Sequence, residues 1–528
     1  MRIPRVVFQS LLAGGVGGLL LLVLLLRLNP EAPPHPGGLV QAAAVWWVWG
    51  AATVGLSLAG IILCAGLWAR GVRKWRWFFP QASALLFILA AVLSRVNADL
   101  HLVFLSGSGH RTLGQDAVVW FGMGLLILAA VRWVPALRGA KGRVVMVVVV
   151  TLLPPLRLVW QPVKVRLERS LVARPLGVPT RPVVVVGVEG LDLNFLLAHA
   201  TADRFPNLRH LTTEGSMGAL RPYRPFLKRS LWTTVATGAY PRAHGVESRW
   251  AWEVPSVLGR PVRLLPLTPV GSRWVLPSFL TRRMPPPPTR IPALWARLAA
   301  AGIPTRVLDW PGIWEDRWAL NRGAAAPLPV LSEDFARSLA SALAPFPQDR
   351  EAIGTAVRRD SANLNAVTDG ASPVADLWIH LGALGMTRRR LAPRGAGDTR
   401  ERAVQELVLE LFDAQIGRIL DLAGPRSVIA VVSPYGLAQP DSWERLRRLL
   451  GGGSKWRRSA RRCPDGVIVL LGPGVVPGRR LGRSEITDLA PTLCYLLGLP
   501  VAQYMDGRVI LDAVNPNYLD ATPLRVVD

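Results

Sequence analysis

Cysteine and histidine are scarce in this sequence, and their placement excludes several kinds of site. The chain of 528 residues contains three cysteines and seven histidines. No two cysteines form a C-x-x-C pair, so zinc-finger and thioredoxin-type chemistry is unsupported. Cys494 lies in an apolar run and is expected to be a core residue. The histidines occupy no metal-ligand spacing, and a lone histidine is more often held by structural contacts than by a metal.

Lysine and acidic residues are also few. Only five of the 62 basic residues are lysine, against 35 acidic residues, and the formal net charge is +27. A charge of this size ordinarily indicates nucleic acid or an anionic surface as partner. However, the arginines accompany abundant Ala, Gly and Pro, which is typical of a high-GC coding bias, and the sequence has no basic module interleaved with aromatic residues. We therefore expect no nucleic-acid partner, and anionic lipid headgroups only as a secondary one.

Apolar residues are concentrated in the first 160 positions. About 20 apolar residues span a bilayer as a helix. Five hydrophobic stretches occur there, near residues 7–26, 41–69, 80–105, 117–137 and 144–160. The first, second and fourth are the strongest candidates, and tryptophans gather near the ends of the stretches, as in an interfacial aromatic belt. The sequence predicts a transmembrane region of about five helices over residues 1–160, followed by a linker over residues 161–181.

Two features inside these stretches have local interpretations. Arg95 and Asp99 lie four residues apart, which predicts an ion pair along one helix. The spacing Gly14-x-x-x-Gly18 resembles a helix-packing seam, but such spacing is frequent by chance in Gly-rich spans, so we expect no special role. The first stretch lacks a following small-x-small cleavage site and is interpreted as an uncleaved anchor.

The cations of the short loops predict an orientation. Arg2 and Arg5 flank the first span, and further cations follow the second span at 70–76 and the fourth at 138–143. The intervening loops are nearly free of them. Because cations favour the cytoplasmic side, the amino terminus is expected inside and residues 161–528 outside the cytoplasm. The sequence thus indicates a multi-pass protein of the inner membrane with an extracytoplasmic domain.

Strand and helix patterns alternate beyond residue 182, which predicts a layered α/β/α domain over residues 182–528. Two segments, near 250–290 and 344–375, interrupt the alternation and are expected to be insertions near the top of the sheet. The expected strands lie at 183–188, 304–308, 376–382, 427–433 and 467–471, and the expected helices near 205–211, 291–301, 332–343, 399–423 and 484–497.

Four segments resemble the alkaline phosphatase superfamily, in particular its type I phosphodiesterase/nucleotide pyrophosphatase branch of membrane-tethered bacterial proteins. They are Val183 to Leu191, Leu231 to Gly238 with Pro241 to Gly245, Asp376 to Leu391, and Ser427 to Ile510. The resemblance implies an alkaline-phosphatase-like fold. It also implies two divalent, zinc-type metal ions held by Asp and His, together with a Ser or Thr nucleophile.

Most positions that would carry this chemistry hold other residues. The first metal ligand of the family corresponds to Glu189, which is a partial retention. The nucleophile position corresponds to Lys228, and Ser230 would serve only with a shift of register. Lysine cannot form the phospho-enzyme, and its positive charge repels a metal.

The later ligands are also replaced. The Asp-x-x-x-His pair of the family corresponds to Gly385 and Arg389, and its Ser-Asp-His-Gly turn to Ser433-Pro434-Tyr435-Gly436. The last ligand histidine falls at Arg462 or Cys463. Because these losses are not conservative, the sequence predicts no metal ligands and no resident cofactor, and Lys228, Arg389 and Arg462 become candidates for binding an anion.

The leading interpretation is a membrane-anchored phosphodiesterase-like protein that lacks catalytic activity and acts as an anion-binding, scaffolding or regulatory module. Membrane lipids, a phosphate-bearing ligand or a membrane protein are its expected partners. One alternative is an active phosphoesterase or phosphotransferase with a rearranged site that uses Glu189, Ser230 and two divalent metals. Another is a transporter-like membrane protein with a soluble appendage, although no inverted repeat is visible.

Overall fold

The computed structural model of the chain describes residues 3–29, 36–68, 78–160, 174–200, 203–224, 227–246, 250–252, 262–263, 281–283, 289–311, 332–368, 376–391, 399–437 and 463–527. The chain divides into two compact units. One comprises residues 1–168 and 247–286, and the other comprises residues 169–246 and 287–528. We call them the helical unit and the α/β domain. The described part of 247–286 forms a small sheet in the order β4-β3-β5, with β3 at Trp250–Trp252, β4 at Val262–Arg263 and β5 at Thr281–Arg283.

All five hydrophobic stretches form helices that are long and apolar enough to cross a membrane. The weaker third and fifth stretches are included, even though Pro154 and Pro155 lie inside the last helix. The second stretch is one span built from two α-helices and a short π-helical segment. The helices are α1 (Ile3–Arg27), α2 (Pro36–Gly50), η1 (Ala51–Gly55), α3 (Leu56–Trp68), α4 (Phe79–Leu100), α5 (Gly107–Trp133), η3 (Pro135–Arg138) and α6 (Ala140–Trp160).

Helix α1 is the centre of the helical unit. In its most apolar 18-residue stretch 83% of the residues are buried, whereas the corresponding share in the other spans is at most 39%. Its glycines make this burial sterically feasible. A Cβ atom on Gly14 would lie 2.4 Å from the backbone nitrogen of Gly55, and one on Gly18 would lie 2.0 Å from the carbonyl oxygen of Trp46. The interpretation of Gly14-x-x-x-Gly18 as chance spacing is therefore wrong, because these glycines let two backbones approach closely. The expected pair of Arg95 and Asp99 is present at 3.3 Å.

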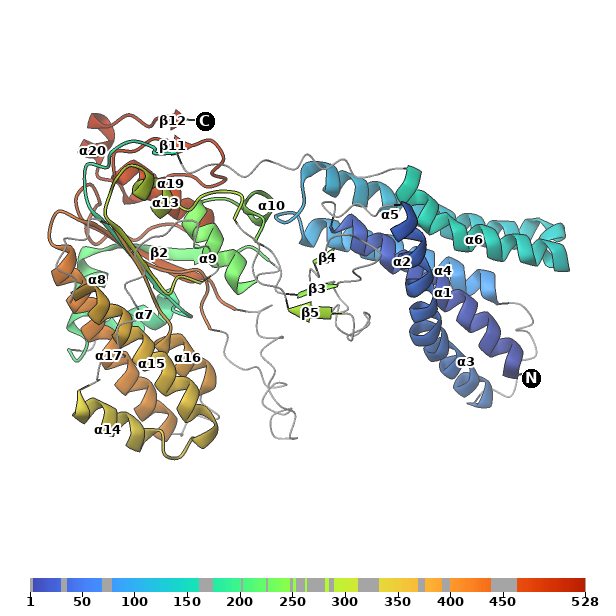
Figure 1. The fold of residues 1–528 in the computed structure, drawn as a ribbon, viewed down its shortest axis with the longest axis horizontal. Coiled ribbons are helices and arrows are strands. Elements are labelled where there is room, and N and C mark those ends of the chain that lie inside the picture. The colour runs from blue at the N-terminus through green and yellow to red at the C-terminus, as the bar shows by residue number, and fades with distance from the viewer. Residues whose placement is uncertain are drawn as a thin grey trace. The chain divides into compact units, whose positions relative to one another are not determined.

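A mixed seven-stranded sheet in the order β10-β2-β9-β8-β1-β7-β6 organises the α/β domain (Figure 1). Strands β6, β7, β1 and β8 are parallel, whereas β9 runs antiparallel between β8 and β2. The predicted α/β/α class is confirmed. The strands are β1 (Val183–Val188), β2 (Ser216–Arg221), β6 (Thr305–Leu308), β7 (Asp376–Leu381), β8 (Val428–Ser433), β9 (Gly466–Leu471) and β10 (Ser484–Glu485), with β11 (Val501–Ala502) and β12 (Val526–Val527) forming a separate pair.

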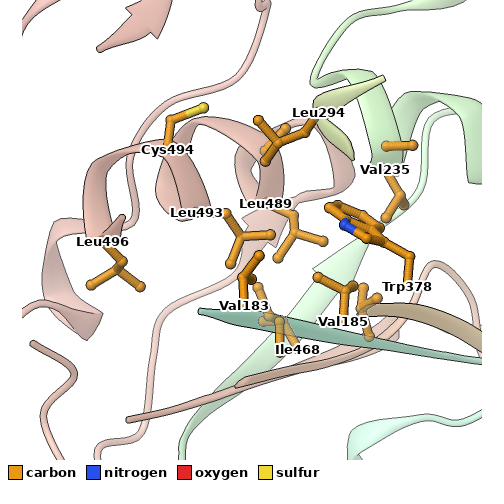
Figure 2. Packing of buried hydrophobic residues seen from close by; sticks show 14 of the residues in the cluster. Val183, Val185, Val235, Leu294, Trp378, Ile468, Leu489, Leu493, Cys494 and Leu496 are labelled. Atoms are coloured by element: carbon orange, nitrogen blue, oxygen red, sulfur yellow. The ribbon is translucent and has the colours of Figure 1, made fainter. Parts of the chain in front are cut away.

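Helices cover both faces of this sheet (Figure 1). Alternate residues of β1 point to opposite faces: Val183 and Val185 join one apolar cluster, and Val184 and Val186 join the other. Figure 2 shows the first cluster, in which valines of β1 lie beneath the leucines of α13 and α19. This face carries α9 (Lys228–Thr237), α13 (Leu294–Ala300) and α19 (Leu489–Leu496), and the other carries α7 (Leu193–Ala200), α8 (Pro206–Glu214), α15 (Pro347–Thr368), α16 (Ala383–Arg390) and α17 (Thr399–Ala423).

Helix α15 occupies most of the segment 344–375, where the sequence pattern predicts no regular element. Its buried residues Ile353, Val357, Leu364 and Val367 follow a helical period, but Asp360 interrupts the stripe and is itself 2% exposed. The carboxylate of Asp360 accepts hydrogen bonds from the backbone nitrogens of Gly382 at 3.0 Å and Ala383 at 2.8 Å. It therefore caps α16 from another helix, which explains a buried acid in an apolar stripe.

The boundaries of other elements also differ from those expected from the sequence. The helix expected at 484–497 begins only with α19, because Ser484 and Glu485 pair with β2 and a 3-10 turn, η7 (Ile486–Asp488), follows. Strand β2 and helices α7, α9 and α16 were not expected. The remaining short elements are α10 (Pro241–His244), α14 (Glu333–Ala342), η8 (Leu511–Ala513) and α20 (Pro516–Ala521).

A buried acid at the start of β7 makes the stability of the domain depend on pH. Asp376 is fully buried and accepts a hydrogen bond from Trp378 Nε1 at 2.7 Å. Burial raises the pKa of Asp376 from 3.8 to about 8. Between these values the carboxyl group keeps its proton in the folded state and loses it in the unfolded chain. The free energy of unfolding therefore falls as the pH rises through this window.

We expect Asp376→Asn to remove this dependence, because the amide does not titrate and retains an oxygen for Trp378. The free energy of unfolding of the variant should gain on that of the wild type between about pH 4 and about pH 8, by at most about 1.4 kcal/mol per pH unit, and its melting temperature should rise accordingly. Asp520→Asn, at an exposed acid, is the control and should show no such gain. Parallel pH profiles for the wild type and Asp376→Asn would contradict the prediction.

Candidate functional site

The parallel strands of the sheet end at one edge and bring several polar residues there. Glu189 follows β1, Asp309 follows β6, and Tyr435 lies two residues beyond β8. The register pairs Val188 with Leu381 of β7, and Glu189 extends this pairing through its backbone nitrogen, which donates to Leu381. The carboxyl edge of a parallel sheet is where α/β proteins commonly place their sites.

Glu189 lies at the centre of this edge and is 3% exposed. One carboxylate oxygen, Oε2, accepts an ion-paired hydrogen bond from Lys228 Nζ. The other, Oε1, accepts one from Arg389 Nη2 and a further hydrogen bond from the Tyr435 hydroxyl at 3.1 Å. We call these four residues the Glu189 network. The structure thus brings together three of the residues predicted from the sequence, namely Glu189, Lys228 and Arg389.

Helix α16 is held unusually close to Glu189 by a glycine. A Cβ atom on Gly385 would lie 2.2 Å from the carbonyl oxygen of Glu189 and 2.8 Å from its Cβ atom. Since residues four apart share one face of a helix, Arg389 also faces Glu189 from the next turn. The pair Gly385 and Arg389, inferred from the spacing of the family's ligands, therefore lies against Glu189 in the structure.

The turn after β8 positions the Tyr435 hydroxyl. The Ser433 hydroxyl accepts a hydrogen bond from the Leu191 nitrogen at 3.1 Å and donates to the Tyr435 carbonyl at 3.0 Å. Gly436 bridges to Gly190 just beyond the end of β1. Burial raises the pKa of the Tyr435 phenol, against a smaller lowering by Arg389. The hydroxyl therefore stays protonated and acts as a donor to Glu189.

Arg388 and Asp192 stabilise the loop after Glu189. Arg388 donates to the carbonyl of Gly190, pairs with Asp192 at 3.4 Å, and lies 3.6 Å from the ring centroid of Phe195. Asp192 also caps α7 by accepting from the Phe195 nitrogen at 2.9 Å. Burial lowers the pKa of Arg388, with Asp192 opposing. These contacts connect helix α16 to the loop that follows Glu189.

Neither Arg359 nor Asp360 was anticipated at this edge. Asp309 has a positive φ of 53° and pairs with Arg359 at 3.6 Å. A non-glycine residue in this conformation is uncommon, and such strain concentrates at functional edges. Burial raises the pKa of Asp309, whereas Arg359 and Lys228 lower it. No sequence signal identified Arg359 or Asp360, because both lie on the unexpected helix α15.

His380 lies at the end of β7 and is 5% exposed. Among the residues that the structure describes, neither of its ring nitrogens has a hydrogen-bond partner. Its ring meets that of Trp232 edge-on at 4.9 Å. Burial lowers the pKa of His380 well below 6.5, and the charges of Lys228 and Arg359 lower it further. The imidazole is therefore neutral.

Ser230 is not part of the Glu189 network. The residue is fully buried, and its hydroxyl accepts a hydrogen bond from the Tyr223 hydroxyl at 2.6 Å. His244 has a structural role in its turn, because its Nδ1 accepts from the Val246 nitrogen and its Nε2 lies 3.0 Å from the Thr234 hydroxyl. Arg462, the third anion-binding candidate, lies outside the described residues, and neighbouring Cys463 is 2% exposed.

The described donors at this edge do not fit the two-metal site that the resemblance implies. Glu189 is the only carboxylate in its network, and both of its oxygens already accept hydrogen bonds from cationic side chains. Within the described ranges, no three His, Cys, Asp or Glu residues are grouped closely enough to hold a metal ion. A divalent ion would also be repelled by Lys228 and Arg389 at short range. In the structure, the side chains of the Glu189 network pair with one another.

We expect Glu189→Gln to destabilise the domain, because it leaves Lys228 and Arg389 without their counter-ion. Removing one partner of a buried pair costs about 3–5 kcal/mol, and we expect about 3 kcal/mol because Lys228 is one-third exposed. Urea unfolding measures the loss. Glu406→Gln removes a half-exposed pair with Arg204 and should cost less than about 1 kcal/mol. Equal, small losses in both variants would show that the network does not stabilise the edge.

The α/β domain matches a known protein family. Residues 183–480 match the family described as Type I phosphodiesterase / nucleotide pyrophosphatase. Among curated proteins, no sequence matches this chain. The family match covers more than half of the chain, including strands β1, β6, β7, β8 and β9 and every residue of the Glu189 network. The chain therefore belongs to the type I phosphodiesterase/nucleotide pyrophosphatase family, within the alkaline phosphatase superfamily.

Proposed function

We propose that the α/β domain is a non-hydrolytic member of its family and binds a phosphate-bearing ligand through Lys228 and Arg389. The observation that carries the proposal is the Glu189 network, in which cationic side chains stand against the carboxylate that would otherwise face a metal. Lysine and arginine bind phosphate oxygens directly, so the site retains affinity for the family's type of ligand without a metal. No metal cofactor is required in this proposal.

The charge balance of the network favours an anion. Lys228 and Arg389 contribute two positive charges and Glu189 one negative charge, so the four residues of the network sum to one positive charge while Tyr435 stays neutral. The side chains of Lys228 and Arg389 are 33% and 23% exposed, whereas that of Glu189 is 4% exposed. A ligand therefore reaches the cations from solvent and competes with Glu189 beneath them.

This competition sets a modest affinity. A charge-assisted hydrogen bond contributes about 1.5–3 kcal/mol, and the ligand must replace contacts that Glu189 already makes. Two such bonds correspond to dissociation constants from about tens of micromolar to several millimolar. Affinity in this range suits a regulatory or scaffolding module that responds to the concentration of its ligand.

The rival proposal is a hydrolase with a rebuilt metal site and Ser230 as nucleophile. The geometry does not favour it, because the Ser230 hydroxyl is fully buried and bonded to Tyr223. Metal binding to the full-length protein and turnover of phosphate esters would distinguish the two.

We expect the purified full-length protein to hold no stoichiometric divalent metal and to hydrolyse neither phosphomonoesters nor phosphodiesters above background. Inorganic phosphate should raise the melting temperature of the α/β domain by mass action. The rise should be larger in Glu189→Gln, where the competing carboxylate is gone, and absent in the double variant Lys228→Ala/Arg389→Ala. Arg400→Ala/Arg426→Ala, which removes two exposed cations of the same domain, is the control and should keep the wild-type rise.

Two results would overturn the proposal. A phosphate effect that survives in Lys228→Ala/Arg389→Ala would place anion binding elsewhere. Turnover that is lost on chelation and in Ser230→Ala would support the rival hydrolase.

We also propose that the α/β domain lies outside the cytoplasm of an inner-membrane protein. Arg27 at the end of α1 and Arg157 near the end of α6 both pair with Asp116, at 2.8 and 2.9 Å. This contact supports an arrangement in which α1 and α6 end at the same side of the helical unit. The amino terminus and the carboxyl end of α6 would then be on opposite sides of the membrane, and the loop cations favour an inside amino terminus.

Cysteine labelling of intact cells tests this orientation. Cysteines introduced into the loop 28–40 should react with an impermeant reagent from outside, and those introduced at 70–79 should react only after permeabilisation. Labelling of 70–79 in intact cells would contradict the proposed orientation.

A further inference from the structure

Three helices of the helical unit meet at a cluster of charged side chains. Asp116 of α5 is 1% exposed, and its two carboxylate oxygens accept hydrogen bonds from Arg27 Nε at 2.8 Å and Arg157 Nε at 2.9 Å. Arg27 is 2% exposed and also donates through Nη2 to the carbonyl of Arg157 at 3.2 Å. We call these residues the Asp116 triad. The triad connects α1, α5 and α6 in a unit whose other buried residues are mostly apolar.

The three members of the triad together carry a net positive charge. One carboxylate faces two guanidinium groups, and arginine stays protonated in proteins. Buried charges are costly in an apolar environment, and charged residues within membrane helices usually mark a functional contact. A further negative charge at the accessible end of the triad is attracted by the sum of these three charges.

Arg157 is the member of the triad that can reach such a charge. Its Nε is used by Asp116, but no acceptor within the described part of the chain contacts its two terminal amino groups. Its side chain is 17% exposed, whereas those of Asp116 and Arg27 are nearly inaccessible. The pair of terminal amino groups offers parallel N–H donors, which match the oxygens of a phosphate.

The position of Arg157 along α6 suits a lipid headgroup. Arg157 lies seven residues beyond Val150, the middle of the helix, which is about 10 Å at 1.5 Å per residue. The hydrocarbon core of a bilayer extends about 15 Å from its centre. A long arginine side chain covers the remaining distance to the phosphate level. Trp160, one turn further along, is 89% exposed, as in an interfacial aromatic belt.

We propose that the Asp116 triad is a binding site for the phosphate of an anionic phospholipid, which Arg157 contacts directly. Asp116 holds the Arg157 side chain through Nε and leaves its terminal amino groups pointing to the headgroup, and Arg27 fixes Asp116 from the other side. An anionic lipid such as phosphatidylglycerol brings a net negative charge to these three residues. A zwitterionic lipid does not, because its own ammonium group cancels its phosphate.

Lipid retention by the full-length protein tests the site. The protein is exchanged from detergent into nanodiscs with mixed phosphatidylglycerol and phosphatidylcholine, re-extracted, and examined by native mass spectrometry. We expect preferential retention of phosphatidylglycerol, and a decrease in that preference of about tenfold in Arg157→Gln. Lys141→Gln, at an exposed cation at the opposite end of the same helix, is the matched control and should keep the preference.

A second variant keeps the test decisive if Arg157→Gln does not fold. Arg157→Lys retains the charge and a pairing partner for Asp116 but loses the parallel donors, so its preference should also fall several-fold. Equal retention of both lipids by the wild type, or full preference in Arg157→Gln or Arg157→Lys, would overturn the proposal. Displacement of phosphatidylglycerol by inorganic phosphate would assign the site to a soluble anion instead of a lipid.

Discussion

A carboxylate buried at the end of a strand must be balanced by positive charge, and the edge of the α/β sheet is arranged around that requirement. Glu189 is delivered there by the β-branched strand β1 and is nearly inaccessible to water. Helix α9 begins with Lys228, helix α16 presents Arg389, and the turn after β8 presents the Tyr435 hydroxyl. These three elements lie far apart in the sequence. Their contacts with the Glu189 carboxylate hold them together at one edge of the sheet.

The helical unit also contains a buried carboxylate that is paired with two cationic side chains. Asp116 is shared by two arginines, as Glu189 is shared by a lysine and an arginine. The composition makes this sharing understandable, because the chain has 62 basic but only 35 acidic residues. When acids are scarce, one buried acid can serve more than one cation. In each unit one of the two cations is the more exposed, namely Lys228 in the α/β domain and Arg157 in the helical unit.

The sequence predicted those parts of the molecule that depend on runs of apolar residues. The five spans and the strands β1, β7, β8 and β9 were recognised because apolar residues predominate along each of these segments. The spacing within each motif also indicated Glu189, Lys228 and Arg389, and in the structure both cations contact Glu189.

Features that depend on a second segment were not predictable in the same way. Asp360 caps a different helix, and its presence in the apolar stripe concealed α15. The need for glycine at positions 14 and 18 becomes apparent only when the backbone atoms of Gly55 and Trp46 are seen to lie against them. Likewise, the motif pointed to Tyr435, but the hydrogen bond from its hydroxyl to Glu189 depends on the geometry of the turn.

Gly385 makes the charge pairing at this edge depend on the size of a single side chain. A Cβ atom at this position would lie 2.2 Å from the carbonyl oxygen of Glu189, so even alanine would displace helix α16. Arg389 lies on the next turn of the same helix and would move with it, away from the Glu189 carboxylate. The contact between one cation and its counter-ion is therefore controlled by a residue that carries no side chain of its own.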